Sequence, residues 1–244
     1  MQQICTREDI KKLGTILSVW AHPDDESFTC AGIMKVAIDG GQVVACITAT
    51  KGELGVQDEA RWPANLLADI RAREMAETLA IIGVKNHHWL GYADGHCHDV
   101  DSAEASQRIY EYIQIYQPDT ILTFGPDGMT GHSDHQSISN WVSLSVAELQ
   151  DKDKPVIYHA VQLKQIHEQY LKAADKQFNI YFNIDQPPLV ESTECAICFH
   201  LPEAVSRTKC AALAAQHSQT EGLLKVFGEE NLPKVFSYET FVLA

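Results

Sequence analysis

The apolar run Thr15-Ile16-Leu17-Ser18-Val19 leads directly into Trp20-Ala21-His22-Pro23-Asp24-Asp25-Glu26, a segment with one histidine and three acids. The run predicts a buried strand, but unpartnered charges inside a protein core cost several kcal/mol. These side chains therefore need a cation, each other or solvent where the strand ends. In open α/β sheets, the carboxyl ends of the strands are also where ligand crevices form.

Strand and helix patterns alternate along most of the chain, which is typical of an α/β protein. We expect strands at 15–19, 42–50, 86–90, 120–124 and 155–160, and helices at 28–40, 65–83, 103–116 and 137–150. Further on, 202–217 favours a helix and 181–184 is compatible with a strand. We interpret residues 1–244 as a single Rossmann-like domain, a three-layer sandwich with a mostly parallel sheet and C-terminal elaborations.

Composition and charge argue against several classes of partner and location. A net charge of −14 argues against nucleic acid or an anionic membrane surface as a partner. The chain has no apolar stretch long enough to span a membrane and no apolar signal-peptide core near Met1, so we expect a cytoplasmic protein. Seven scattered cysteines suit a reducing compartment, and Cys195 and Cys198 are best explained as core filler on a strand. The sequence leaves the oligomeric state open, homo-oligomers included.

A second polar cluster follows the apolar run at 120–124: Gly131-His132-Ser133-Asp134-His135. A catalytic zinc ion takes three protein ligands from His, Asp and Glu and leaves one position open to water. We expect His22 and Asp25 to face one ion across the turn after the first strand, with His135 as the third ligand. The same ligands suit other divalent ions, such as Fe²⁺.

The remaining polar residues of the two clusters fit hydrolytic roles. Asp24 stays free to take a proton from activated water, and His132 is placed to donate to a developing oxyanion. Asp134 would orient one of the imidazoles. The alternative is a structural role without catalysis, in which the acids form a solvated loop or cap a helix and the histidines support the fold.

Together, these two motifs resemble the LmbE-like (PIG-L) family of zinc-dependent N-acetylglucosaminyl deacetylases. Further segments fit the same family: Thr50-Lys51-Gly52-Glu53, the helix with Arg71-Ala72-Arg73-Glu74, Asp94-Gly95, Lys209 and His217-Ser218-Gln219. The resemblance runs from about residue 15 to about residue 220. Ser133 stands where many members carry proline, a departure that touches no ligand.

The resemblance implies the same metal set, His22, Asp25 and His135, with Asp24 as general base. It also implies that His132 stabilises the tetrahedral intermediate with support from Asp134. Substrate contacts are then expected from Glu53, Arg71 and His217. The implied reaction removes an N-acetyl group from a small amino-sugar substrate, for example a conjugate of malate or inositol.

Two other functions remain open from the sequence. The same chemistry would serve a metal-dependent amidase acting on another acylated amine or natural product, and the fold would also serve a non-catalytic sugar-binding module. A second metal-like cluster, Gly95-His96-Cys97-His98-Asp99, is better explained as a polar loop at the rim of the cleft. Cys97 shows no sign of an environment that would make it a nucleophile.

Overall fold

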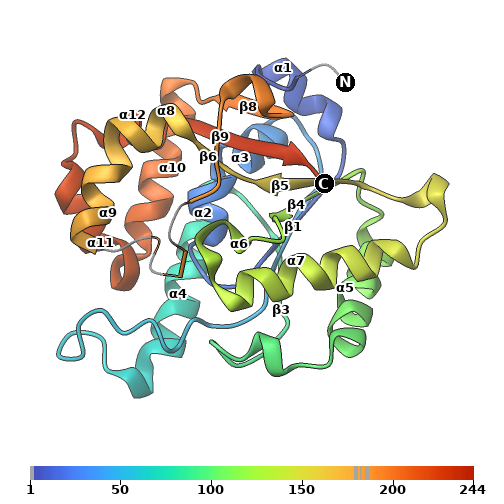
Figure 1. Cartoon of the computed structure of the whole chain (residues 1–244), viewed down its shortest axis with the longest axis horizontal. Coiled ribbons are helices and arrows are strands. Elements are labelled where there is room, and N and C mark those ends of the chain that lie inside the picture. The colour runs from blue at the N-terminus through green and yellow to red at the C-terminus, as the bar shows by residue number, and fades with distance from the viewer. Residues whose placement is uncertain (1–2, 179–180, 182, 185–186) are drawn as a thin grey trace.

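A seven-stranded sheet forms the middle of the part of the chain that the computed structural model describes, residues 3–178, 181, 183–184 and 187–244 (Figure 1). Its strand order is β3-β2-β1-β4-β5-β9-β8. The strands are β1 (Ile16–Trp20), β2 (Val44–Thr48), β3 (Asn86–Trp89), β4 (Thr120–Phe124), β5 (Val156–Ala160), β8 (Ile197–His200) and β9 (Tyr238–Leu243). Neighbours among β1–β5 pair in parallel, whereas β9 pairs antiparallel with both β5 and β8.

The strand order places a topological switch point beside β1. The chain moves outward from β1 through β2 to β3, then returns to the other side of β1 with β4 and continues outward to β5. The loops that leave β1 and β4 therefore turn in opposite directions and open a crevice at the carboxyl ends of these two strands. Both polar clusters of the sequence follow these strands.

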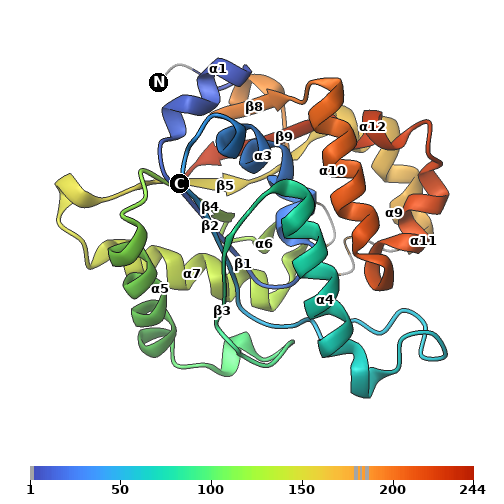
Figure 2. The same cartoon turned by 180° about the vertical axis from the view of Figure 1, so that it is seen from behind.

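Helices cover both faces of the sheet (Figures 1 and 2). On one face α3 (Ala31–Asp39), α4 (Ala64–Ile82) and α10 (Glu203–Ala215) pack together, and on the other α5 (Ser102–Tyr116) packs against α7 (Ser133–Ala147). This division follows from right-handed crossovers, because the chain reverses its direction across the sheet after β3. The result confirms the predicted α/β fold.

The remaining elements are short or belong to the C-terminal part of the chain. The helices are α1 (Arg7–Ile10), α2 (Asp25–Thr29), α6 (Gly128–Gly131), α8 (Lys164–Ile166), α9 (Lys172–Phe178), α11 (His217–Phe227) and α12 (Leu232–Val235). The tighter or wider turns are the 3₁₀ helices η1 (Lys11–Leu13), η2 (Cys97–Asp99), η3 (Asp151–Asp153) and η5 (Ser192–Glu194) and the π-helix η4 (His167–Leu171). Two short strands, β6 (Gln162–Leu163) and β7 (Leu189–Val190), form a second sheet.

The central strands carry the core. Every residue of β1, β2 and β4 is buried, as expected for parallel strands covered on both faces. Trp20 and Phe124 meet edge to face at 4.8 Å between ring centroids, directly before the two polar clusters. This packing holds the ends of β1 and β4 rigidly beside each other.

The predicted elements agree with the structure to within a few residues, with three differences. The helix expected at 28–40 begins already at Asp25 and breaks at Cys30 into α2 and α3. The helix expected at 202–217 ends at Ala215, and α11 follows. Of the strand expected at 181–184, Tyr181 and residue 183 lie in turns, and residue 182 lies outside the described residues.

None of the helices in the described ranges has the length and apolar character needed to cross a membrane.

Candidate active site

The two polar clusters meet at the carboxyl ends of β1 and β4. After β1 the chain turns sharply, so that α2 begins at Asp25. After β4 the chain passes through Gly128 and Met129, both with positive φ, and α7 then begins at Ser133. His132 is the N-cap of α7, and its Nδ1 accepts a hydrogen bond from the N–H of Asp134 at 3.1 Å.

Three side chains that the sequence predicts as metal ligands converge on one point. His22 Nδ1 lies 3.2 Å from His135 Nε2 and 3.7 Å from Asp25 Oδ2. His135 Nε2 lies 3.5 Å from Asp25 Oδ1. All three residues are buried.

The outer hydrogen bonds of both imidazoles fix where their protons lie. His22 Nε2 lies 3.0 Å from Asp94 Oδ1 and 3.2 Å from Asp134 Oδ2, so this nitrogen carries a proton. His135 Nδ1 donates to the carbonyl of Gly128 at 2.9 Å. When both rings are neutral, the inner nitrogens, His22 Nδ1 and His135 Nε2, are therefore the ones free to coordinate a cation, beside the carboxylate of Asp25.

Such a set of acceptors fits a divalent cation. Ligand atoms held about 2.0–2.2 Å from a tetrahedral ion lie about 3.3–3.6 Å from one another, close to the 3.2 Å between the two imidazole nitrogens. Asp25 faces His22 with Oδ2 and His135 with Oδ1, so both of its oxygens border the same place. His132 adds another nitrogen nearby, since ligand atoms of His22, His132 and His135 all lie within 4.8 Å of one another. The residues present thus fit a metal site with an orienting carboxylate behind one imidazole.

The electrostatics of this centre also favour positive charge. Burial lowers the pKa of His22, but hydrogen bonds with Asp134 and Asp94 outweigh it and raise that pKa to about 10. Burial lowers the pKa of His135 to about 4, which keeps this imidazole neutral and able to coordinate. The carboxylates of Asp25, Asp94 and Asp134 thus favour positive charge at His22: without a metal the raised pKa keeps this ring protonated, and a cation at Nδ1 would replace that proton.

Asp24 lies beside the centre in a strained conformation. Its φ of 105° is unusual for a residue with a side chain, and such strain often concentrates at functional sites. Burial raises the pKa of Asp24 to about 7, against the opposing effect of the Arg71 guanidinium. A carboxylate with a pKa near neutrality is well suited to accept and return a proton.

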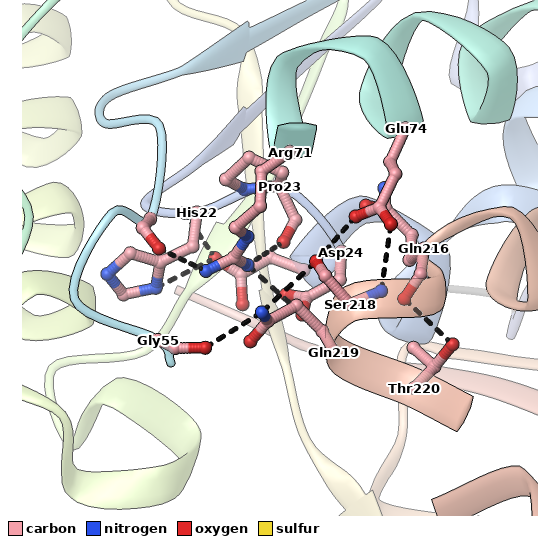
Figure 3. Close-up of polar contacts among 12 residues, drawn as sticks. His22, Pro23, Asp24, Gly55, Arg71, Glu74, Gln216, Ser218, Gln219 and Thr220 are labelled. Carbon is pink, nitrogen blue, oxygen red and sulfur yellow. Dashed lines mark hydrogen bonds and ion pairs between the residues drawn. The ribbon is translucent and has the colours of Figure 1, made fainter. Parts of the chain in front are cut away.

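Arg71 supports this loop from α4 (Figure 3). Its Nη2 donates to the carbonyl of Pro23 at 2.5 Å and lies 3.3 Å from Asp24 Oδ2, while Nη1 donates to the carbonyl of Gly52 at 2.7 Å. A Cβ on Gly52 would lie 2.0 Å from Nη1, so only glycine fits there. The sequence predicts substrate binding by Arg71; it lines the cavity, but its donors hold the backbone around Asp24.

Glu53 and Asp134 also hold neighbouring loops. The carboxylate of Glu53 accepts from the N–H of Asp94 at 3.0 Å. Asp134 is fully buried and accepts from the N–H groups of Gly95 and Cys97 at 2.7 and 3.1 Å. The structure places the Asp134 carboxylate 3.2 Å from His22 Nε2, where it orients that imidazole; the support of His132 by Asp134 that the resemblance implies stays a prediction.

His132 has a defined tautomer when neutral. Since Nδ1 accepts the capping hydrogen bond, the ring proton is on Nε2. Burial lowers the pKa of His132, so the neutral form prevails near neutral pH. The ring lies 4.8 Å from that of His22, centroid to centroid, and lines the cavity.

Among the residues after α10, the structure brings a different side chain to the site than the sequence predicts. His217 is exposed and is not among the residues that line the cavity, whereas Gln219, two positions on, is. Glu74 on α4 accepts from the N–H and Oγ of Ser218 at 2.8 and 2.6 Å and so fixes the start of α11 (Figure 3). Gln219 then donates to the carbonyl of Gly55 at 2.8 Å.

The other metal-like groups of the sequence are not assembled as a metal site. His96 and His98 are exposed and contact Asp99 at 3.0 and 3.4 Å, while the side chain of Cys97 is buried. Cys198 on β8 packs with Cys195 in an apolar cluster, in line with their interpretation as core filler.

A cavity of about 580 Å³ opens over the metal-ligand candidates. It contains His22, Asp24, Asp25, His132 and His135 together with Arg71, Asp94 and Gln219. Asp94 and Gln219 lie in segments that resemble family motifs, but the sequence alone gives neither side chain a role in the site.

Comparisons with known proteins agree with this geometry. Residues 17–146 match the family described as PIG-L: GlcNAc-PI de-N-acetylase. A probable N-acetyl-alpha-D-glucosaminyl L-malate deacetylase 2 from Bacillus cereus is 28% identical over 212 residues, which are 86% of each chain. A 1D-myo-inositol 2-acetamido-2-deoxy-alpha-D-glucopyranoside deacetylase from Kineococcus radiotolerans is 30% identical over 161 residues. The match covers 54% of this chain and 45% of that protein.

Among solved structures, the N,N'-diacetylchitobiose deacetylase from Pyrococcus horikoshii superposes with a TM-score of 0.64 at 21% identity, covering 96% of this chain and 85% of that one. This likeness concerns the fold. The family match at residues 17–146 spans more than half of this chain, and the chain therefore belongs to the PIG-L family.

Proposed function

We propose that the chain is a divalent-metal-dependent deacetylase that hydrolyses the N-acetyl group of an N-acetylglucosamine-type substrate to acetate and a free amino sugar. The observation that carries this proposal is the convergence of three acceptor groups, from His22, Asp25 and His135, beside Asp24 in one cavity. The names of the relatives, which are deacetylases of N-acetylglucosaminyl compounds, support the same reaction.

In this proposal His22 Nδ1, His135 Nε2 and the Asp25 carboxylate hold the metal. Two imidazoles and a carboxylate suit zinc, and Fe²⁺ is the alternative for the same ligands. When bound, such an ion supplies Lewis-acid chemistry that activates water and polarises the amide carbonyl. Asp94 and Asp134 keep His22 in the tautomer that coordinates through Nδ1.

The remaining groups move the protons. Asp24 accepts the proton of the attacking water, and Arg71 holds the backbone on which Asp24 sits. His132 donates from Nε2 to the oxygen that gains charge as the carbonyl is attacked. Protonated Asp24 then returns its proton to the nitrogen of the leaving amine, so that the free amino sugar departs neutral.

We further propose a cytoplasmic location and a small amino-sugar substrate. The seven cysteines are unpaired, as is usual for proteins of a reducing compartment. Asp94, Arg71 and Gln219 supply polar groups on one side of the metal-ligand candidates, where sugar hydroxyls find partners.

The experiment that tests the function is acetate release from N-acetylglucosaminides by metal-loaded protein and by His135→Ala. We expect release by the native chain, and loss of both bound metal and release in the variant. His159→Ala is a matched control, since His159 lies on β5 outside the cavity-lining set. Release by His135→Ala at the native rate would contradict the assigned ligand set.

A second variant tests the orienting carboxylates. Asp94→Asn keeps an acceptor near His22 Nε2 but removes its charge, so we expect metal affinity to fall by about 10–100-fold. Competition against a fluorescent zinc chelator measures this affinity. Asp99→Asn, an exposed acid of the adjacent loop, is the control; equal affinities of the two variants would refute the role of Asp94.

A further inference from the structure

We infer that the substrate carries an apolar chain or ring next to its amino sugar, and that an apolar chamber in the same cavity binds it. This inference rests on the proposed deacetylase function and adds the chemical class of its substrate. The chamber is formed by Phe28, Leu163, Ile166, Leu171, Leu223 and Phe236. The substrate group that binds there is apolar in either of two cases: as part of the N-acyl group or as part of the aglycone.

The cavity has two chemically different sides. One side is formed by Gly55, Arg71, Asp94 and Gln219, which contact the loop that leads into α4 or belong to it. Arg71 donates to the carbonyl of Gly52, Gln219 donates to the carbonyl of Gly55 (Figure 3), and Asp94 accepts from the N–H of Leu54. The chamber comes from α2, the segment from β6 to η4, the end of α12 and Leu223 of α11, one turn after Gln219. In Figure 1 the helices α8 and α12 and the loop before α4 lie on different sides of α2. The polar and the apolar lining residues of the cavity thus come largely from different elements, and both sets share the cavity with the metal-ligand candidates.

The chamber is a continuous apolar surface. Phe28 and Phe236 contact each other, with ring centroids 5.8 Å apart. Both belong to an apolar cluster that also contains Leu171 and Leu223. Leu163 and Ile166 belong to a second cluster, which contacts Leu171 as well. These apolar side chains and the polar metal-ligand candidates line the same cavity.

The chamber offers no free charge to a polar substituent. The carboxylate of Glu239, which borders it, is held by Lys209 Nζ at 2.8 Å and by the N–H groups of Gly32 and Ile33 at 2.7 Å each. Among the described residues that line the cavity, Arg71 is the only lysine or arginine. Its Nη1 and Nη2 are committed to backbone carbonyls and to Asp24, and its Nε, on the polar side of the cavity, is buried without a hydrogen-bond partner in the described part of the chain.

A dianionic substituent such as malate would therefore lose its hydration without gaining a cation, which is unfavourable. An apolar group gains instead, by about fourfold in affinity for each methylene that the chamber buries. The volume of about 580 Å³ lies in the range of cavities that enclose drug-sized ligands, so it has room for a sugar with a substituent. The chamber thus favours an apolar substituent over the malate of the Bacillus cereus relative's name.

The test measures the release of free amine from four substrates by metal-loaded protein. They are methyl N-acetylglucosaminide as reference, its octyl glycoside, methyl N-octanoylglucosaminide and N-acetylglucosaminyl malate. We expect kcat/KM at least about tenfold above the reference for the octyl or the octanoyl compound, and no gain for malate. A gain with the octyl glycoside assigns the chamber to the aglycone, and one with the octanoyl amide assigns it to the acyl group.

Leu223→Asn keeps the side-chain size but places an amide in the chamber. It should remove most of the preference for the apolar compound, measured as the ratio of kcat/KM for that compound to kcat/KM for the reference. Val226→Asn on the same helix is the control, since Val226 is exposed and does not line the cavity. Calorimetry of octyl N-acetylglucosaminide with chelator-treated protein measures binding without turnover and should show weaker binding in Leu223→Asn only.

These outcomes separate the two proposals. If no substrate releases amine while Leu223→Asn still weakens calorimetric binding, the deacetylase proposal fails and the chamber inference stands. If amine is released but the four substrates react alike, or malate is preferred, the chamber inference is overturned and the deacetylase proposal stands. An equal effect of Leu223→Asn on every substrate also overturns it.

Discussion

Replacing Asp24 with asparagine is expected to lower kcat for amide hydrolysis by about 10²–10⁴-fold while the protein keeps its metal. Asparagine has nearly the same shape, so Arg71 keeps its backbone contacts with Pro23 and Gly52. What the amide lacks is the basic carboxylate that takes the proton from water. The effect should therefore appear in kcat, with little change in KM.

Metal content and steady-state kinetics of Asp24→Asn, measured on the same sample, check this result. Asp101→Asn is a matched control, because Asp101 is an exposed acid that caps α5. We expect the control to hydrolyse the substrate at the native rate. Loss of metal from Asp24→Asn would mean that Asp24 is a ligand, and an unchanged kcat would remove it from the mechanism.

The largest effect on stability is expected from Lys209→Met. The side chains of Lys209 and Glu239 are 1% and 0% exposed, and Lys209 Nζ donates to Glu239 and to the carbonyl of Phe28, at 2.8 Å each. Removing one partner of a buried ion pair leaves the other charge without compensation, so the free energy of unfolding should fall by about 3–5 kcal/mol. Urea unfolding followed by circular dichroism measures this change.

The double variant Lys209→Met with Glu239→Gln completes the test. Because it removes both charges, it should recover part of the lost stability, and the difference from additivity gives the coupling between the two side chains. Lys225→Met is the surface control: its ion pair with Glu221 is exposed, and such pairs contribute about 0–1 kcal/mol. Equal urea midpoints for Lys209→Met and Lys225→Met would show that the buried pair does not stabilise the fold.

The sequence predicts well those residues of the site that directly follow a buried strand. His22 and Asp25 follow one buried strand and His135 follows another, and parallel strands place such ends at one edge of a sheet. The structure brings these three side chains together, while their role as ligands remains our proposal. The α/β alternation likewise predicted β1–β5 and their helices, because each element has its own periodicity.

The part that the sequence could not assign depends on contacts between distant segments. Asp94 reaches His22 only because Glu53 and Asp134 hold its loop. Gln219 rather than His217 lines the cavity, since Glu74 sets the start of α11. The apolar chamber also combines residues from four separate parts of the chain, and no local pattern in any of them distinguishes a cavity wall from ordinary core.

Acetate release by chelator-stripped protein, titrated with zinc, tests whether the reaction depends on a metal at His22, Asp25 and His135. We expect no release from an N-acetylglucosaminide without metal, a rise in proportion to added zinc, and a plateau at one ion per chain. The same titration with His135→Ala should stay flat. Full activity of metal-free protein, or a flat titration of the native chain with zinc bound, would show that the reaction does not use this metal site.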